Sequence, residues 1–455
     1  MGIVKAGLKI LVYLITILGY ILLPIFLNFK GNIILSLILS LILIFSTIKI
    51  IKNIIKKEKG SKAKNILFCT LNLILIVIVG AITVTVVELY KEEDRSIALY
   101  AVLEKTEMEP EGYNDVFKKE EKENYKILYT EKLEPALNNI NLILDRAIKL
   151  NNRIFGDFDK ESVTIKFDYI KDVFEGRDSS EGSDGLYMPL TREIYVYGKD
   201  AYDDALSGGG SMKLQDSLIH EYTHHVMFEF FKVNDIDSKT IPLWFIEGVA
   251  EHVADTNYIT EINEIVPFSK LVTTEQWENN LQKENTIYMQ SKYAVRRIVI
   301  LKGEDKLKDI ILKSKESDFN TAFKEVVGIS IEDLENIMNE DLKDNFTKQF
   351  HEFRNANKDI YEEEKIYLDK YMNEKEKALE KYISIDNNPD AYAHLARIYI
   401  GGDEYDKAEK LLKEGIEKNQ DEAELYRELG LMYEEKNQLE LAKECFKKEE
   451  SLNKK

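Results

Sequence analysis

An apolar helix that contains two histidines and a glutamate within about one turn is the feature that most constrains this chain. Residues 212–231, MKLQDSLIHEYTHHVMFEFF, place apolar side chains at helical intervals, which predicts a buried helix. The same segment contains His220, Glu221 and His224, and burying such polar groups is costly unless each finds a partner. The two histidines are four residues apart, so one helical turn directs both imidazoles toward a common point. A metal ion is the partner that suits all three side chains.

Zinc is the metal that this spacing favours. In a catalytic site zinc takes three protein ligands and keeps a fourth position open for water. Glu221 follows His220 directly and can act as a general base toward such a water. The sequence therefore predicts Zn²⁺ bound by His220 and His224, with Glu221 as a catalytic residue and a third ligand elsewhere in the chain.

A second helical segment carries carboxylates on one face. In PLWFIEGVAEHVAD, residues 242–255, Glu247 and Glu251 are four residues apart. Together with HEYTHH, this segment resembles the peptidase MA-like gluzincins, zinc metallopeptidases related to thermolysin and to aminopeptidase N, whose second element reads W-x-x-E-G-x-A. The resemblance implies Glu247 as the third zinc ligand and Glu251 as a carboxylate that supports a ligand histidine. The alternative for Glu251 is a solvated helix face.

The metzincin type of zinc site does not fit this sequence. It requires a glycine three residues and a histidine six residues after His224, and those positions hold Met227 and Phe230. Two further histidines, His225 and His252, neighbour stronger candidates on a different helix face, and we interpret both as bystanders.

The gluzincin resemblance also implies a tyrosine that donates a hydrogen bond to the developing oxyanion, within a Y-x-x-[GS] pattern. Tyr288 and Ser291 fit this pattern, with Tyr293 as the rival tyrosine. A phenol that donates to a negative oxygen in a dry site stabilises the transition state specifically. We expect Tyr288 to be the catalytic tyrosine, and the sequence leaves Tyr293 open as the alternative.

The first 89 residues contain three long apolar runs, which extend from Ile10 to Phe29, from Gly31 to Ile48 and from Asn65 to Val87. About 20 apolar residues suffice for a helix to cross a bilayer, so these runs predict a three-span transmembrane anchor over residues 1–89. A lysine-rich loop between the second and third runs predicts, by the positive-inside rule, that the rest of the chain lies outside the cytoplasm. We therefore expect a multi-pass protein of the cell membrane with an extracytoplasmic catalytic domain.

The segments before the metal-binding helix show a charged stretch and strand patterns. Residues 90–129 are rich in charge, which indicates a solvated stalk. Residues 163–170 alternate with period two and predict a strand, and residues 185–198 predict a pair of short strands. The net charge of the chain is −19, which is a poor match for nucleic acid, since nucleic-acid surfaces require clustered Lys and Arg.

The C-terminal region contains an internal repeat of 34 residues, in which Tyr392, Leu395, Tyr399 and Ala408 recur as Tyr426, Leu429, Tyr433 and Ala442. This period is that of the tetratricopeptide repeat, a helix–turn–helix unit, and the pattern resembles that family. The repeats can form a groove for a peptide or protein partner, or they can only cap the rest of the fold. Both interpretations stay open.

These observations predict an α+β gluzincin-like catalytic domain over residues 130–355, preceded by three transmembrane helices and followed by an all-α repeat region over residues 356–455. The predicted function is a membrane-anchored, zinc-dependent peptidase with a peptide or protein substrate. The alternative is a non-catalytic, zinc-containing scaffold that binds partners through its repeats. Glu221 favours the enzyme, because a purely structural zinc site closes its fourth position with a protein ligand.

Overall fold

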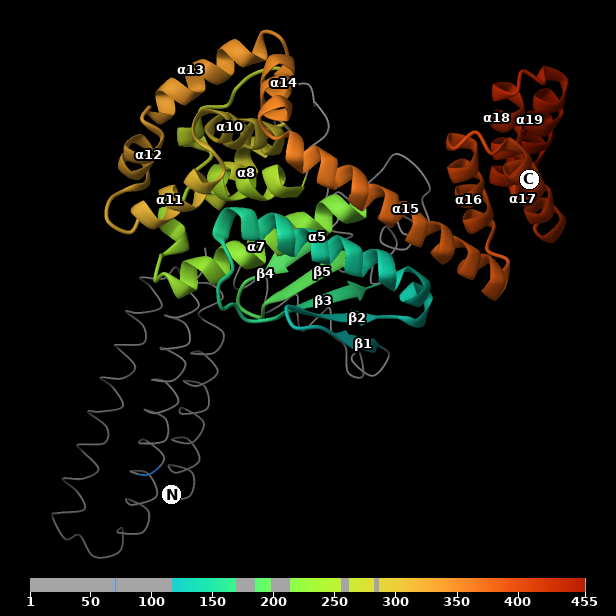
Figure 1. The fold of residues 1–455 in the computed structure, drawn as a ribbon, viewed down its shortest axis with the longest axis horizontal. Helices are drawn as coiled ribbons and strands as arrows, with labels where there is room; N and C mark the ends of the chain where they lie inside the picture. The colour runs from blue at the N-terminus through green and yellow to red at the C-terminus, as the bar shows by residue number, and fades with distance from the viewer. Residues whose placement is uncertain are drawn as a thin grey trace, which may run out of the picture. The chain divides into compact units, whose positions relative to one another are not determined.

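The computed structural model describes residues 70, 117–168, 185–197, 213–254, 262–281 and 286–454. The chain divides into two compact units, residues 1–106 and 107–455. The elements described below belong to the second unit, which is mostly helical and contains one small sheet (Figure 1).

The prediction of three transmembrane helices requires correction. Among the residues that the structure describes, no helix is both long enough and apolar enough to cross a membrane. The longest, α7 (Lys213–Val233) and α15 (Lys358–Asp386), carry charged side chains that would be expensive in hydrocarbon. Apart from Thr70, the three predicted spans lie outside the described residues. The transmembrane part of the predicted fold, and the multi-pass membrane location inferred from it, are therefore withdrawn.

A five-stranded mixed sheet precedes α7, the helix that carries His220 and His224. Its strands are β1 (Lys118–Glu121), β2 (Tyr125–Tyr129), β3 (Val163–Asp168), β4 (Gly185–Met188) and β5 (Glu193–Tyr197). They lie in the order β1-β2-β3-β5-β4, with the two inner pairs parallel and the two outer pairs antiparallel. The strand predicted from residue 163 and the two short strands predicted within residues 185–198 are confirmed.

Residues 118–129 do not form the solvated stalk that their charge suggested. Strand β2 buries Tyr125, Ile127 and Tyr129 in the main hydrophobic core, and β1 pairs with β2 along its outer edge. The charged side chains of β1 are mostly exposed, which is typical of an edge strand. The apolar residues of β2 therefore pack into the core although the surrounding segment is highly charged.

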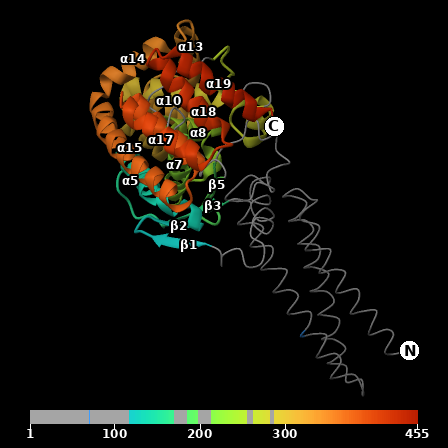
Figure 2. The ribbon, with the colours of Figure 1, turned by 90° about the vertical axis from the view of Figure 1, so that its right-hand side faces the viewer.

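Helices α5 (Leu137–Phe155) and α7 lie on the same side of the sheet (Figures 1 and 2). A short 3₁₀ turn at Glu131–Ala136 leads into α5, whose apolar stripe belongs to the same core as β2 and β3. The Asn151 side chain of α5 donates to Thr223 Oγ1 of α7 over 3.0 Å. This packing holds α7 firmly against the sheet.

The remaining helices of the candidate catalytic region are α8 (Leu243–Ala254), α9 (Thr274–Leu281), α10 (Ile287–Lys302), α11 (Asp305–Lys313), α12 (Phe319–Val327), α13 (Ile331–Leu342) and α14 (Thr347–Ala356). Short 3₁₀ turns occur at Ser238–Thr240 and Phe268–Lys270. Helices α8 and α10 meet at Gly248, where an added Cβ would lie 2.6 Å from the Ser291 carbonyl oxygen. Only glycine allows the two backbones to approach this closely.

The repeat region consists of α16 (Pro389–Gly401), α17 (Tyr405–Lys418), α18 (Ala423–Glu435) and α19 (Leu439–Asn453), after the long helix α15. Two pairs of equivalent positions of the 34-residue period, Tyr399 with Tyr433 and Ala408 with Ala442, lie in or against one hydrophobic cluster. This cluster is separate from the core that contains the sheet and α7.

Candidate metal centre

Helix α7 brings its two motif histidines together. The Nε2 atoms of His220 and His224 lie 3.0 Å apart, with the rings edge to face. The neighbouring apolar residues Ile219 and Tyr222 are buried in the core, so the helix cannot rotate to expose its polar face. The local helical spacing thus produces the convergence of both rings that the sequence predicted.

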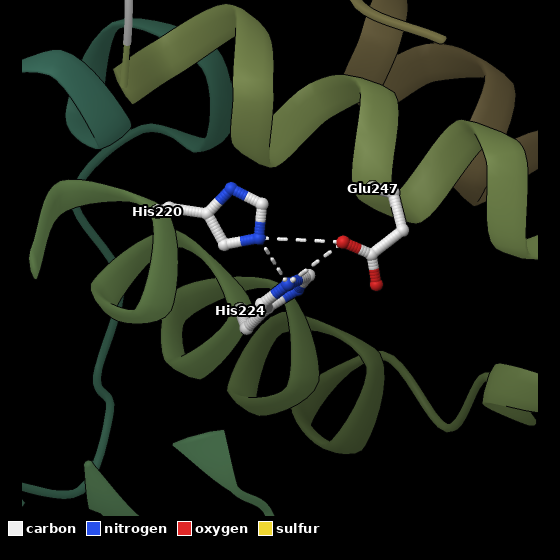
Figure 3. A group of neighbouring side chains, drawn as sticks. All are labelled: His220, His224 and Glu247. Atoms are coloured by element: carbon white, nitrogen blue, oxygen red, sulfur yellow. Dashed lines mark hydrogen bonds and ion pairs between the residues drawn. The ribbon is translucent and has the colours of Figure 1, made fainter. Parts of the chain in front are cut away.

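Helix α8 adds a carboxylate to this pair (Figure 3). The Oε2 atom of Glu247 lies 3.3 Å from Nε2 of His220 and 3.4 Å from Nε2 of His224. These three side chains form the group of potential metal ligands found within the described residues. Glu247 comes from a different helix, and its position depends on the close packing of α8 against α10.

The spacing of these three atoms fits a zinc ion. Ligand atoms about 2.0–2.1 Å from a tetrahedral zinc lie about 3.3–3.4 Å from one another. The two distances from Glu247, 3.3 and 3.4 Å, match that value, and the 3.0 Å between the two imidazole nitrogens is slightly shorter. The donor set of two imidazoles and one carboxylate is one that zinc takes in catalytic sites. The residues present therefore fit the metal that the sequence predicted.

Glu251 lies at the other nitrogen of His220. Its Oε1 atom is 3.1 Å from Nδ1 of His220, one helical turn after Glu247. A carboxylate at Nδ1 fixes the orientation of the ring and leaves Nε2 free to bind a metal. Of the two interpretations of Glu251, the geometry is that of a supporting carboxylate.

The electrostatics of the group favour a cation. Burial raises the pKa of Glu247. The charges and hydrogen bonds of the two histidines have a larger, opposite effect, so this pKa lies below its ordinary value. Burial lowers the pKa of His220, but hydrogen bonds to Glu247 and Glu251 hold it well above its ordinary value. The carboxylates thus attract positive charge, which a metal ion can supply in place of a proton.

Glu221 is oriented by the neighbouring edge strand. Its Oε2 atom accepts a hydrogen bond of 2.7 Å from the backbone N–H of Tyr187 in β4. A Cβ added at Gly185 would lie 3.0 Å from Cγ of Glu221, so a larger residue there would press on this side chain. Burial raises the pKa of Glu221. The sequence predicts short strands within residues 185–198 but gives no sign of the contacts that Gly185 and Tyr187 make with Glu221.

The structure separates the two candidate tyrosines. The Tyr288 ring lies at the metal centre, with its centroid 6.4 Å from that of His220. Tyr293 is 1% exposed and stacks on Phe346 at 4.2 Å between ring centroids. Since Tyr293 packs in the core, Tyr288 is the tyrosine that lies beside the candidate ligands.

The two histidines interpreted as bystanders make other contacts. Nδ1 of His225 lies 3.4 Å from the hydroxyl of Tyr187, and Nε2 of His252 lies 3.4 Å from a carboxylate oxygen of Glu304. Neither ring belongs to the group formed by His220, His224 and Glu247.

Comparisons with known proteins match two parts of the chain. Residues 212–343, which contain the three candidate ligands, match the family model for collagenase, a family of metallopeptidases. Residues 376–430 match the model for the tetratricopeptide repeat. The chain is also 27% identical over 243 residues to the uncharacterized protein YhcO of Bacillus subtilis (strain 168). The matched region covers 51% of this chain and 74% of that protein. No solved structure is significantly similar to the chain. By these matches, a metallopeptidase-type segment similar to collagenase is joined in this chain to tetratricopeptide repeats.

Proposed function

We propose that this protein is a zinc-dependent peptidase of the gluzincin type, with His220, His224 and Glu247 as its zinc ligands. The observation that carries the proposal is the convergence of Nε2, Nε2 and Oε2 of these residues within 3.4 Å of one another. The match of the surrounding segment to collagenase supports a peptidase over other zinc enzymes.

A zinc ion held by His220, His224 and Glu247 would act as a Lewis acid that activates a water molecule for attack. Glu221 would accept the proton of that water. Its Oε2 atom is held by the Tyr187 N–H, so we assign the proton to Oε1. Burial raises the pKa of Glu221, which makes its carboxylate a stronger base than an exposed one.

Tyr288 and Glu251 complete the proposed machinery. The hydroxyl of Tyr288 would donate to the oxygen that becomes negative as the peptide carbonyl is attacked. Burial and the nearby carboxylate of Glu247 raise the pKa of Tyr288, so the phenol keeps its proton at neutral pH. Glu251 would hold the His220 ring in place through Nδ1.

A peptidase implies a peptide or protein substrate, and tetratricopeptide repeats are typical of protein interaction. The repeats have a hydrophobic cluster of their own, which supports a partner-binding role that is separate from the chemistry. The other interpretation is that the C-terminal helices only cap the catalytic region. It is supported by a contact of α15 with that region, in which the Tyr382 hydroxyl donates to the Lys132 carbonyl over 2.8 Å.

Substitution of Glu221 by glutamine tests the proposal. The amide keeps the shape of the side chain but cannot accept the proton, and loss of a general base lowers the rate by roughly 10²–10⁴-fold. The full chain should keep its zinc content while cleavage of a peptide library collapses. Glu278→Gln, an exposed position on α9, removes the same charge and should cleave like wild type. Equal cleavage by wild type and Glu221→Gln would favour the alternative, a zinc-containing scaffold that binds partners through its repeats.

A further inference from the structure

His225, the histidine that directly follows His224, contacts the same tyrosine as Glu221. Glu221 and His225 are four residues apart on α7, so both side chains project from one side of the helix. Glu221 accepts the backbone N–H of Tyr187 over 2.7 Å, and Nδ1 of His225 lies 3.4 Å from the hydroxyl of the same tyrosine. Helix α7 thus holds Tyr187 at two points, one on its backbone and one at the tip of its side chain.

Aromatic packing fixes the His225 ring between two tyrosines. Its centroid lies 5.6 Å from that of Tyr187 and 5.6 Å from that of Tyr222, with both pairs edge to face. The ring is 0% exposed, and Tyr187 is 6% exposed. Phe228, one turn further along α7, lies 6.0 Å from Tyr187 between ring centroids. The Tyr187 ring therefore packs on His225 and Phe228, whereas its backbone N–H is bonded to Glu221.

A buried histidine is an expensive choice if it only fills space. A leucine or phenylalanine would occupy a similar volume without any polar atom to remove from water. The Tyr187 hydroxyl gives Nδ1 of His225 a hydrogen-bond partner inside the core. An imidazole nitrogen and a phenol hydroxyl can each donate or accept, so this bond can form with either tautomer of the ring. The bond to Tyr187 accounts for a polar side chain at this position.

Strand β4, which carries Tyr187, has little else to hold it in place. It spans only Gly185–Met188 and is the outer strand of the sheet, where it pairs with β5 (Figure 1). An edge strand forms ladder hydrogen bonds on one side only. Contacts with α7 therefore determine how far the Tyr187 N–H lies from the Glu221 carboxylate.

We propose that His225 is a positioning residue that anchors Tyr187 of β4 to α7, so that the Tyr187 N–H holds Glu221 in the orientation required of a general base. The inference rests on the proposed peptidase function for the role of Glu221. The anchoring of β4 is nevertheless a property of the folded chain, and it can be tested without any measurement of cleavage.

The first test measures amide hydrogen exchange of β4 by mass spectrometry in the full chain. His225→Leu keeps a buried apolar side chain and removes the ring nitrogens, whereas Tyr187→Phe removes only the hydroxyl. In both variants the amides of Gly185–Met188 should exchange faster by roughly 3- to 10-fold, the factor that one neutral hydrogen bond contributes to a local opening equilibrium. His225→Asn should restore slow exchange, because its side-chain amide can place a polar atom near the position of Nδ1.

His252→Leu is the matched control. It replaces another buried histidine, on α8, whose Nε2 lies 3.4 Å from a carboxylate oxygen of Glu304, and the exchange of β4 should stay as in wild type. Tyr187→Phe is nearly isosteric with wild type and keeps the test decisive if His225→Leu does not fold. Unchanged exchange of β4 in Tyr187→Phe, or an equal acceleration in His252→Leu, would overturn the inference.

The second test is a double-mutant cycle on peptide cleavage. In His225→Leu, kcat should fall by roughly 3- to 30-fold at equal zinc content, less than the roughly 10²-fold cost of a 1 Å displacement near the reacting groups. KM should change little, because the substitution is buried and acts on Glu221. In the Glu221→Gln background, His225→Leu should have little further effect, since the base through which it acts is already lost. Tyr187→Phe takes its place in the cycle if His225→Leu does not fold.

The outcomes distinguish the two proposals. Independent, multiplicative losses in the cycle would show that His225 only fills space in the core. If wild type with zinc bound cleaves no peptide, the proposed function fails, and the exchange experiment still decides whether His225 anchors β4.

Discussion

The Oε1 atom of Glu251 lies 3.1 Å from Nδ1 of His220. Loss of such a supporting carboxylate typically lowers metal affinity by about 10–100-fold. Glu251→Ala should therefore weaken zinc binding by that factor, and Glu251→Gln by less, because the amide oxygen still accepts from Nδ1. Titration against a competing chelator measures both. The control is Glu275→Ala, an exposed position on α9. Equal affinity in all four proteins would assign Glu251 to the solvated helix face instead.

Glu247→Ala should abolish stoichiometric zinc binding, because it leaves two imidazoles and no third ligand. A ligand that binds only the folded state stabilises it by about 2.7 kcal/mol at 100 times its Kd. Added zinc should therefore raise the thermal midpoint of the wild type and leave that of Glu247→Ala nearly unchanged. Metal analysis after dialysis gives the content directly. A variant that retains one zinc per chain would exclude Glu247 as a ligand.

Gly430→Ala should destabilise the repeats without affecting the metal centre. A Cβ at this position would lie 2.6 Å from the Phe446 ring, and overpacking typically costs about 1–3 kcal/mol. Gly401→Ala is the matched control, since a Cβ there meets nothing within 4 Å and alanine favours a helix. Urea unfolding should show a loss of stability only for Gly430→Ala, while zinc content stays at one per chain in both. A loss of zinc in Gly430→Ala would show that the repeats and the metal centre are coupled.

Protonation of His394 should destabilise the repeats in acid. Its Nδ1 accepts from the Arg397 guanidinium over 2.8 Å, and burial together with Arg397 lowers its pKa to about 3. The unfolded chain binds a proton on this histidine below about pH 6.5 and the folded chain does not, so stability falls as the pH decreases below 6.5.

The size of this effect can be measured by urea unfolding at pH 7 and pH 5. Linkage gives a loss of up to about 2 kcal/mol over that interval, reduced because the ring is partly exposed. His394→Gln removes the titrating group and should lose correspondingly less stability on acidification. An identical pH dependence in both proteins would contradict the assignment.

The helix that carries His220 and His224 was predictable from the sequence because its information is local. The spacing of His220 and His224 determines that both rings meet on one helix face, and the apolar residues around the motif, such as Ile219 and Val226, determine which face of the helix is buried. The repeats are equally local, since each period of 34 residues specifies one helical hairpin. Strand β2 was misjudged because a strand of only five residues within a highly charged stretch gives a weak signal.

The chain order of His220, Glu221, His224 and Glu247 was therefore enough to suggest a zinc site, but the contacts that shape it come from segments far apart in sequence. The backbone of β4 orients Glu221, and the packing of Phe346 on Tyr293 leaves Tyr288 as the tyrosine at the centre. Helical spacing is a property of neighbouring residues, and a sequence displays it directly. Which strand edge or aromatic ring meets a side chain depends on how the whole core packs, and only the tertiary structure decides that.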